Sequence, residues 1–324
     1  MENINDVYEK MYLSYKEPPK HCERVFFHYT SPTGILGIFN TNNPKLYFSQ
    51  YDSLNDLNER KDILHTLHKY CDIKVTEGKM ESAFSDKIKE IKYDDLFLIT
   101  ETVEDSITLP SGETIDKINQ ISNKECYVYI CSFSEKADSL PMWRMYAKSE
   151  HYEGYNIGFD RILYTSDSDY LKGYSLELKN VIYSEEEKFN LLDKLILPAC
   201  EVYSKATQKE KNNFLSIIRN FIFKYQFIFK NPAFEYENEV RAILKIPKSK
   251  TGPIDNISER KFRTTSGVVI PYVEVEFPAY VIEEIHMAPS LHSEVAKSNL
   301  ESFLSSKGYA DINVIPSDIP VRNF

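Results

Sequence analysis

The chain has 324 residues, of which 42% are hydrophobic and 27% are charged. These proportions are typical of a folded globular protein, and the length fits one large domain with insertions. The 39 basic and 49 acidic residues give a net charge of −10, which argues against a protein whose main work is to coat nucleic acid. Five cysteines without a Cys-x-x-Cys pair favour reduced thiols over a disulfide framework.

The apolar runs are short and interrupted by charge, so we expect no membrane span. Residues 1–20 mix acidic and basic groups without an apolar centre, which is typical neither of a secretory signal nor of a transit peptide. We therefore expect a cytoplasmic protein. One local basic track is either the solvated face of a helix or a face for nucleic acid. It consists of Lys205, Lys209, Lys211, Arg219, Lys224 and Lys230.

The elements begin with a short apolar strand at residues 25–28, followed by Ser31 as an N-cap and Pro32 in the first helical turn. Residues 56–92 and 185–229 have the periodicity of helices. The other expected elements are strands at residues 45–49, 127–133, 154–159, 181–183, 235–246, 268–277 and 281–287, and a short helix at residues 142–147.

Strands thus surround two helical insertions, at about residues 56–92 and 185–230, and no repeat, low-complexity tract or Pro/Gly/Ser linker interrupts the chain. This order predicts a single α+β domain over residues 1–324, in which strands from both ends of the chain meet in one sheet system.

A Glu-x-Glu-x-Arg pattern lies in the strand expected at residues 235–246. Alternation along that strand places Glu237, Glu239 and Arg241 on one face, with the two carboxylates roughly 7 Å apart. Such a row raises the pKa of one acid and lowers that of the acid beside the arginine, which gives the two acids different roles. The alternative is an edge strand with a solvated, salt-bridged outer face.

Aromatic side chains follow the strand at residues 127–133. Pro141 in a first helical turn places Trp143 three residues before Tyr146, and their rings could hold a nicotinamide or a base. The alternative is hydrophobic core. His28 stands between a strand and a helix start, where it could bind a ribose hydroxyl or act as an acid or base; the alternative is a structural histidine.

Several cofactor signatures are absent from the sequence. There is no Gly-x-Gly-x-x-Gly, no Gly-x-x-x-x-Gly-Lys and no Gly-x-Ser-x-Gly, so a dinucleotide would have to be held by side chains. A helical set with three-residue spacing does not converge on one metal ion, and we expect no metal. That set is Asp62, His65, His68 and Cys71.

Motifs in order along the chain resemble a bacterial family of domains of unknown function, which is similar in layout to ADP-ribosyltransferases of the His-Tyr-Glu type. Some of those enzymes are toxins that modify nucleic acid. The motifs are His28 to Ser31, Leu54-Asn55-Asp56 with Glu59, Phe133-Ser134 leading to Trp143 and Tyr146, Gly154 to Phe159, and Phe234 to Arg241. The resemblance implies two facing antiparallel sheets split by a cleft that holds NAD as co-substrate.

The resemblance also implies roles for single residues. Glu239, with Glu237 as the substitute candidate, would bond the nicotinamide ribose 2′-hydroxyl and stabilise the oxocarbenium-like centre. Arg241 would orient the glutamates. The cofactor would be held by His28 on a ribose with Tyr29 and Thr30 beside it, by Tyr146 or Trp143 on nicotinamide, and by Arg24 or Arg144 on the pyrophosphate. Tyr29, Tyr47, Tyr51 and Tyr155 are other tyrosines for the stacking position.

The same resemblance implies a toxin or phage-defence effector in the cytoplasm, with RNA, DNA or protein as its target and an antitoxin or other regulatory protein as partner. Two alternatives stay open. One is a non-catalytic module that binds a nucleotide or a peptide. The other is a metal-dependent nuclease that uses Asp56, Glu59 and Glu237.

Overall fold

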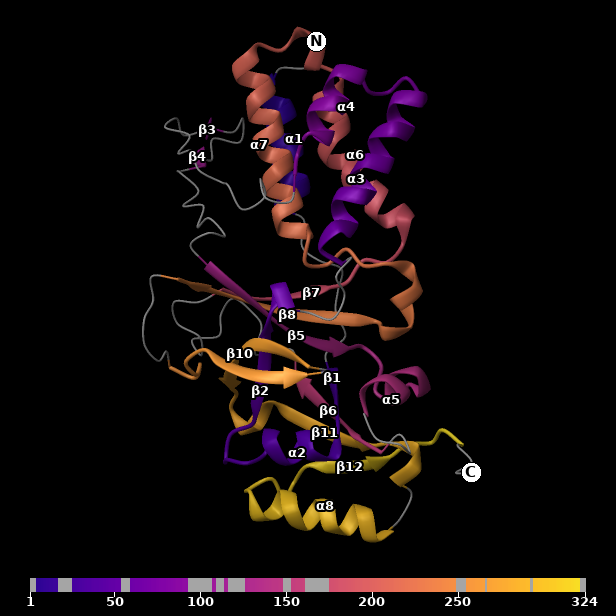
Figure 1. The fold of residues 1–324 in the computed structure, drawn as a ribbon, viewed down its shortest axis with the longest axis vertical. Helices are drawn as coiled ribbons and strands as arrows, with labels where there is room; N and C mark the ends of the chain where they lie inside the picture. The colour runs from indigo at the N-terminus through magenta and orange to yellow at the C-terminus, as the bar shows by residue number, and fades with distance from the viewer. Residues whose placement is uncertain are drawn as a thin grey trace.

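The computed structural model describes residues 4–16, 25–53, 59–92, 107–108, 114–115, 126–147, 153–160, 175–248, 255–265, 267–291 and 294–320. The fold is α+β, with a large open mixed sheet and helices at both of its ends (Figure 1). The expected fold class is therefore confirmed at this level. Within these ranges no helix is long and apolar enough to cross a membrane.

Ten strands form the main sheet, in the order β12-β11-β6-β1-β5-β2-β10-β9, with β8 paired to β5 and β7 paired to β8. All pairs are antiparallel except β11 with β12. Two short strands, β3 (Ile107–Thr108) and β4 (Thr114–Ile115), pair separately. The sheet strands are β1 (Val25–Thr30), β2 (Lys45–Gln50), β5 (Cys126–Ser134), β6 (Tyr155–Asp160), β7 (Ser175–Asn180), β8 (Glu239–Pro247), β9 (Lys261–Thr265), β10 (Val268–Glu276), β11 (Ile282–Met287) and β12 (Asn313–Pro316).

The helices fall into two groups around this sheet. One group forms a helical lobe at the N-terminal end of Figure 1, while α2 and α8 lie at the opposite end and α5 lies beside the sheet. The lobe contains α1 (Ile4–Lys16), α3 (Glu59–Thr76), α4 (Ser82–Lys89), α6 (Glu185–Cys200) and α7 (Gln208–Tyr225). The others are α2 (Pro32–Ile38), α5 (Leu140–Tyr146) and α8 (Glu294–Ser306).

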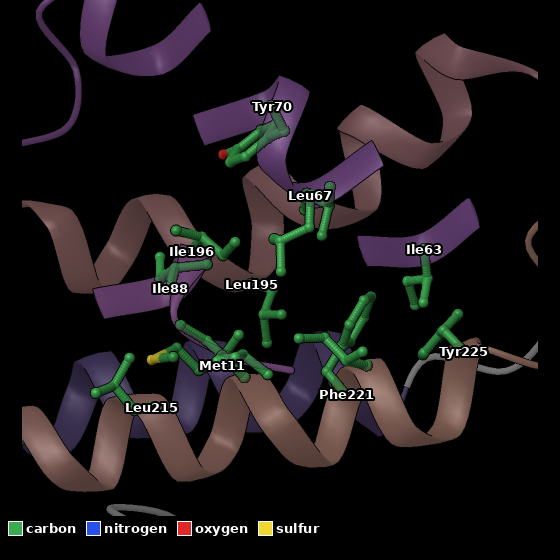
Figure 2. Packing of buried hydrophobic residues seen from close by; sticks show 14 of the residues in the cluster. Met11, Ile63, Leu67, Tyr70, Ile88, Leu195, Ile196, Leu215, Phe221 and Tyr225 are labelled. Atoms are coloured by element: carbon green, nitrogen blue, oxygen red, sulfur yellow. The ribbon is translucent and has the colours of Figure 1, made fainter. Parts of the chain in front are cut away.

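Apolar side chains from all five helices close the lobe (Figure 2). The buried ring of Tyr70 is held at its hydroxyl, which donates to Asp193 Oδ1 at 2.8 Å, and Lys74 pairs with the same carboxylate at 2.8 Å. These contacts fasten α3 to α6. Between β7 and β8 the chain leaves the sheet, forms α6 and α7 in the lobe, and returns to the sheet at β8.

Strands β5 and β8 are buried on both faces. Tyr129 and Leu244 belong to the core under the sheet, whereas Ile130 and Ile243 pack into the helical lobe. A charged side chain buried near Ile130 and Ile243, such as that of Arg241, is shielded from bulk water and needs a partner inside the protein. This burial excludes the solvated edge strand that was the alternative interpretation of Glu-x-Glu-x-Arg.

Several local predictions are confirmed. Ser31 caps α2 by accepting a hydrogen bond from the Gly34 amide at 3.1 Å. The helical stretch at 185–229 divides into α6 and α7, which begins with a capping box between Thr207 and Glu210. The strand expected at residues 181–183 is not formed, because these residues contribute only one isolated bridge, at Ile182. The elements α1, β3, β4, β7, β9, α8 and β12 had no sequence prediction.

Candidate active site

A cavity of about 490 Å³ lies where β1 and β2 meet β5. It combines residues from all three segments singled out in the sequence, which are far apart along the chain. Its size is within the range of sites for small organic ligands. The residues that line it include His28, Tyr29, Thr30, Tyr47, Ser132, Tyr146, Glu237, Glu239 and Arg263.

The cavity arises because two strands share one edge of β5. Strand β1 pairs with β5 only at Phe27 with Ser134, and β2 pairs with it at Ser49 with Ile130 and Gln50 with Tyr129. The other edge of β5 is paired with β8 along its whole length. Between the two short pairings β1 and β2 diverge, and residues 131–133 of β5 form the floor of the opening.

Glu237 and Glu239 do not alternate along one strand, as the sequence predicted. Glu237 ends a 3-10 helix (Pro232–Glu237), and Asn238 has the left-handed backbone conformation, with φ 43° and ψ 50°. Strand β8 begins only at Glu239. The turn at Asn238 breaks the two-residue repeat, which is why the two acids converge on one ammonium group and do not stand in a row.

Glu239 lies in a buried charge cluster. Its Oε1 accepts from Arg241 Nε at 2.9 Å, and its Oε2 accepts from Arg241 Nη2 and Lys230 Nζ, both at 2.9 Å. Burial alone raises the pKa of Glu239, but Arg241 and Lys230 outweigh burial and hold the pKa at about 2. Glu239 is therefore ionised throughout the physiological range. Arg241 Nη1 also donates to the Phe227 carbonyl at 2.6 Å, which fixes the guanidinium behind the acid.

Glu237 shares the Lys230 ammonium group with Glu239 through Oε2. Its Oε1 accepts from the Tyr146 hydroxyl at 3.0 Å. Burial raises the pKa of Glu237 above the ordinary value, although Lys230 opposes this. The two acids thus differ in the direction predicted from the sequence, one with a raised and one with a lowered pKa. Glu237 is the better candidate for moving a proton, and Glu239 for holding a fixed negative charge.

His28 faces the cavity from β1. Its Nδ1 lies 3.0 Å from the Ser132 carbonyl oxygen. Because a carbonyl only accepts, Nδ1 must carry the proton, which leaves Nε2 as an acceptor in the neutral ring. Burial lowers the pKa of His28, and Arg263 lowers it further. The imidazole is therefore neutral at pH 7 and suited to accept a hydrogen bond from a ligand hydroxyl.

Trp143 is fully buried and packs edge-on against Tyr29, with ring centroids 4.7 Å apart. Its Nε1 donates to Asp138 Oδ1 at 2.6 Å, and Tyr29 donates from its hydroxyl to the Lys136 carbonyl at 2.8 Å. Tyr146, Tyr29 and Tyr47 line the cavity, whereas Trp143 lies in the packing behind it. Of the two residues considered for stacking, the geometry favours Tyr146.

The remaining sequence candidates are placed as follows. Thr30 lines the cavity. Arg144 is exposed on α5 and does not line it, and Arg24 lies outside the described residues. Among the described residues, no group of three or more His, Cys, Asp or Glu could hold a metal ion. Asp56 of the nuclease hypothesis also lies outside the described residues.

The sequence did not identify Lys230 or Arg263 as site residues. Lys230 was counted in the basic track, but it follows α7 and is buried between Glu237 and Glu239, which corrects its interpretation as part of a solvated helix face. Arg263 lines the cavity from β9. Spacing along the chain gives no signal for either contact, because both depend on how distant strands pair.

A domain of the family described as "Protein of unknown function (DUF2971)" is found at residues 142–242. This span contains Tyr146, Lys230, Glu237 and Glu239, and it ends before Arg263. The finding fits the expectation of a bacterial family of unknown function. No curated protein and no solved structure matches the chain.

Proposed function

We propose that the protein is an NAD-dependent ADP-ribosyltransferase-like enzyme that modifies a macromolecule, either a nucleic acid or a protein. The main support is that one cavity contains His28, Tyr146, Glu237 and Glu239, which come from three distant segments. A neutral histidine, an aromatic ring and a pair of acids with opposite pKa shifts are the groups that transfer from an N-glycosidic bond requires.

The divergence of β1 and β2 along one edge of β5 supports the proposal that two facing sheets are split by a cleft. A sheet that opens at this point has two parts facing a common cleft, as the ADP-ribosyltransferase resemblance implies. The strands are nevertheless joined by hydrogen bonds into one sheet through β5. The split arrangement is therefore part of the proposal.

The residues present fit NAD as a co-substrate. His28 Nε2 would accept from a ribose hydroxyl, with Thr30 beside it, and the ring of Tyr146 would lie against nicotinamide. Lys230 and Arg241 hold the acids in place on the lobe side of the sheet. NAD supplies an activated ribosyl group, because positive charge develops on the sugar as its bond to nicotinamide breaks.

Side chains of the protein would stabilise that charge and accept the proton that the reaction releases. The ionised carboxylate of Glu239 is preorganised in a buried site, where fixed charges act strongly on a developing cation. Glu237 would accept the proton of the attacking group on the target, since burial raises its pKa above the ordinary value. The hydroxyl of Tyr146 positions Glu237 for this transfer.

The proposed setting is a toxin or phage-defence effector, with a macromolecular target and an antitoxin or other regulatory protein as partner. This part of the proposal rests on the resemblance alone. The proposed contact face, if the target is nucleic acid, consists of Lys209, which is exposed on α7, and of the half-buried Lys211 and Arg219.

A non-catalytic nucleotide-binding module is a second candidate, and one observation favours it. Both carboxylate oxygens of Glu239 are already engaged by Arg241 and Lys230, as in a structural ion cluster. In that case the cavity would bind the ligand without cleaving it.

Nicotinamide release from labelled NAD separates the two candidates. The protein is incubated with NAD and with RNA, DNA or protein fractions, and both free nicotinamide and label on each fraction are measured. The enzyme hypothesis expects release that Glu237→Gln reduces by at least about a hundredfold while the fold is retained. Glu177→Gln is the control, because Glu177 is also paired with a lysine, Lys245 at 3.2 Å, but lies outside the cavity. Binding of NAD without any nicotinamide release would favour the binding module.

A further inference from the structure

Arg263 extends from β9 to the wall of the cavity. Its Nη2 donates to Ser49 Oγ at 2.9 Å. Its guanidinium lies over the rings of Tyr47 and Tyr272, 5.5 and 5.7 Å from their centroids. The two tyrosines are themselves in contact across β2 and β10, with centroids 4.6 Å apart. These contacts with Ser49, Tyr47 and Tyr272 hold the Arg263 side chain in one orientation.

The charge of Arg263 is not balanced by an acid. Lys45, another cation of the cavity wall, pairs with Glu276 at 3.2 Å. Glu237 and Glu239 share Lys230, and Glu239 also pairs with Arg241. In the part of the chain that the structure describes, Arg263 has no carboxylate within ion-pair distance, and its Nε is buried without a hydrogen-bond partner. One end of the cavity therefore has a net positive charge and an unsatisfied donor.

We propose that Arg263 forms an anion subsite, which binds a phosphate group of the ligand whose sugar lies beside His28 and Tyr146. A planar guanidinium is suited to phosphate because it carries five N–H donors in one plane, and the Nε donor of Arg263 still lacks a partner. The preferred ligands are nucleotides with a pyrophosphate group. This inference deepens the proposed function and rests on it for the identity of the ligand, whereas the anion site itself rests on Arg263 alone.

The electrostatics of neighbouring groups agree with this placement. Burial raises the pKa of the Cys131 thiol. Arg263 lowers this pKa, whereas Glu239 raises it further. Arg263 and Glu239 therefore both act electrostatically on Cys131, which lies in the floor of the same cavity. A ligand with an anionic part and a neutral sugar would match these two ends. Arg144, considered for the pyrophosphate from sequence, is exposed outside the lining.

The test uses inorganic pyrophosphate as the probe in calorimetric titrations of the full chain. The wild type should bind pyrophosphate, Arg263→Gln should weaken binding at least about tenfold, and Arg263→Lys should fall between them. Arg260→Gln is the matched control: Arg260 is near in sequence, but its guanidinium lies over Tyr127 and Phe262, outside the cavity lining. Thermal unfolding checks that each variant is folded.

A second titration compares NAD with nicotinamide riboside, which lacks phosphate. Arg263→Gln should weaken NAD binding and leave that of the riboside within about twofold. Equal pyrophosphate affinity in wild type and Arg263→Gln, or no binding by the wild type, would overturn the anion site. Arg263-dependent pyrophosphate binding without nicotinamide release would instead uphold the anion site and count against the proposed enzyme.

Discussion

Arg241 binds Glu239 side-on, with Nε on Oε1 and Nη2 on Oε2, each at 2.9 Å, and both side chains are buried. Buried ion pairs are costly to break, because removing one partner leaves the other charge in a poorly solvated place. Lys230 adds a second cation to the same carboxylate. The buried charges of Glu239, Arg241 and Lys230 therefore depend on one another.

Glu239→Gln should lower the free energy of unfolding by about 3–5 kcal/mol, since Arg241 would lose its ion pair with Glu239 while Lys230 would retain only its pair with Glu237. Chemical denaturation measures this. Glu274→Gln breaks a partly exposed pair with Lys261 at 2.8 Å and should cost less than about 1 kcal/mol. Combining Glu239→Gln with Arg241→Gln should cost clearly less than the sum of the two single changes; strict additivity would contradict the coupling.

The stability of the protein should fall as the pH decreases below about 6.5, partly through His28. Burial lowers the pKa of His28 in the folded state, so the unfolded chain takes up this proton first. The stabilising contribution of His28 is present above the pKa of this residue in the unfolded chain. It is lost as the pH falls through the pKa of His28 in the folded protein.

His28→Gln tests this directly, because the amide can still donate to the Ser132 carbonyl but does not titrate. Denaturation curves from pH 7.5 to 5 should be flatter for the variant than for the wild type. His68, whose pKa is also lowered by burial, acts equally in both proteins and cancels in the comparison. Identical pH profiles would show that His28 does not titrate differently on folding.

The sequence predicted best the features that depend on neighbouring residues. The strand before Ser31 and the cap of α2 follow from local chemistry and are confirmed. The division between a helical lobe and the sheet was also predictable, because α6 and α7 have the period of buried helices. The convergence of His28, Tyr146 and the two glutamates was expected from a resemblance, and the structure places all four in one cavity.

The sequence could not predict the contacts made across the fold. Asn238 adopts a left-handed conformation, which removes Glu237 from the strand pattern. In the sequence Lys230 resembles a surface lysine, but in the fold it follows α7 and donates to Glu239 at the start of β8. The position of Arg263 depends on the pairing of β9 with β10 and of β10 with β2. Each of these features comes from pairing between segments that are distant in sequence.

Two glycines should respond in opposite ways to substitution by alanine. A Cβ at Gly154 would lie 2.7 Å from Ala147 Cβ and 2.8 Å from the Thr30 carbonyl oxygen, at the junction of α5 and β1. Gly154→Ala should therefore cost about 1–3 kcal/mol. A Cβ at Gly37 would meet nothing within 4 Å, so Gly37→Ala in α2 should stabilise the protein by up to about 1 kcal/mol. Urea midpoints of both variants provide the measurement, and equal shifts would contradict the prediction.

Tyr146 is proposed to have two separable functions, one of its ring and one of its hydroxyl. Tyr146→Phe keeps the ring but removes the donor to Glu237 Oε1, so kcat for nicotinamide release should fall roughly tenfold with KM for NAD little changed. Tyr146→Leu also removes the ring and should raise KM as well. Tyr155→Phe is the control, because Tyr155 is partly buried in β6 outside the cavity lining. If Tyr146→Phe and Tyr155→Phe have the same kcat, the hydroxyl of Tyr146 does not position Glu237 for proton transfer.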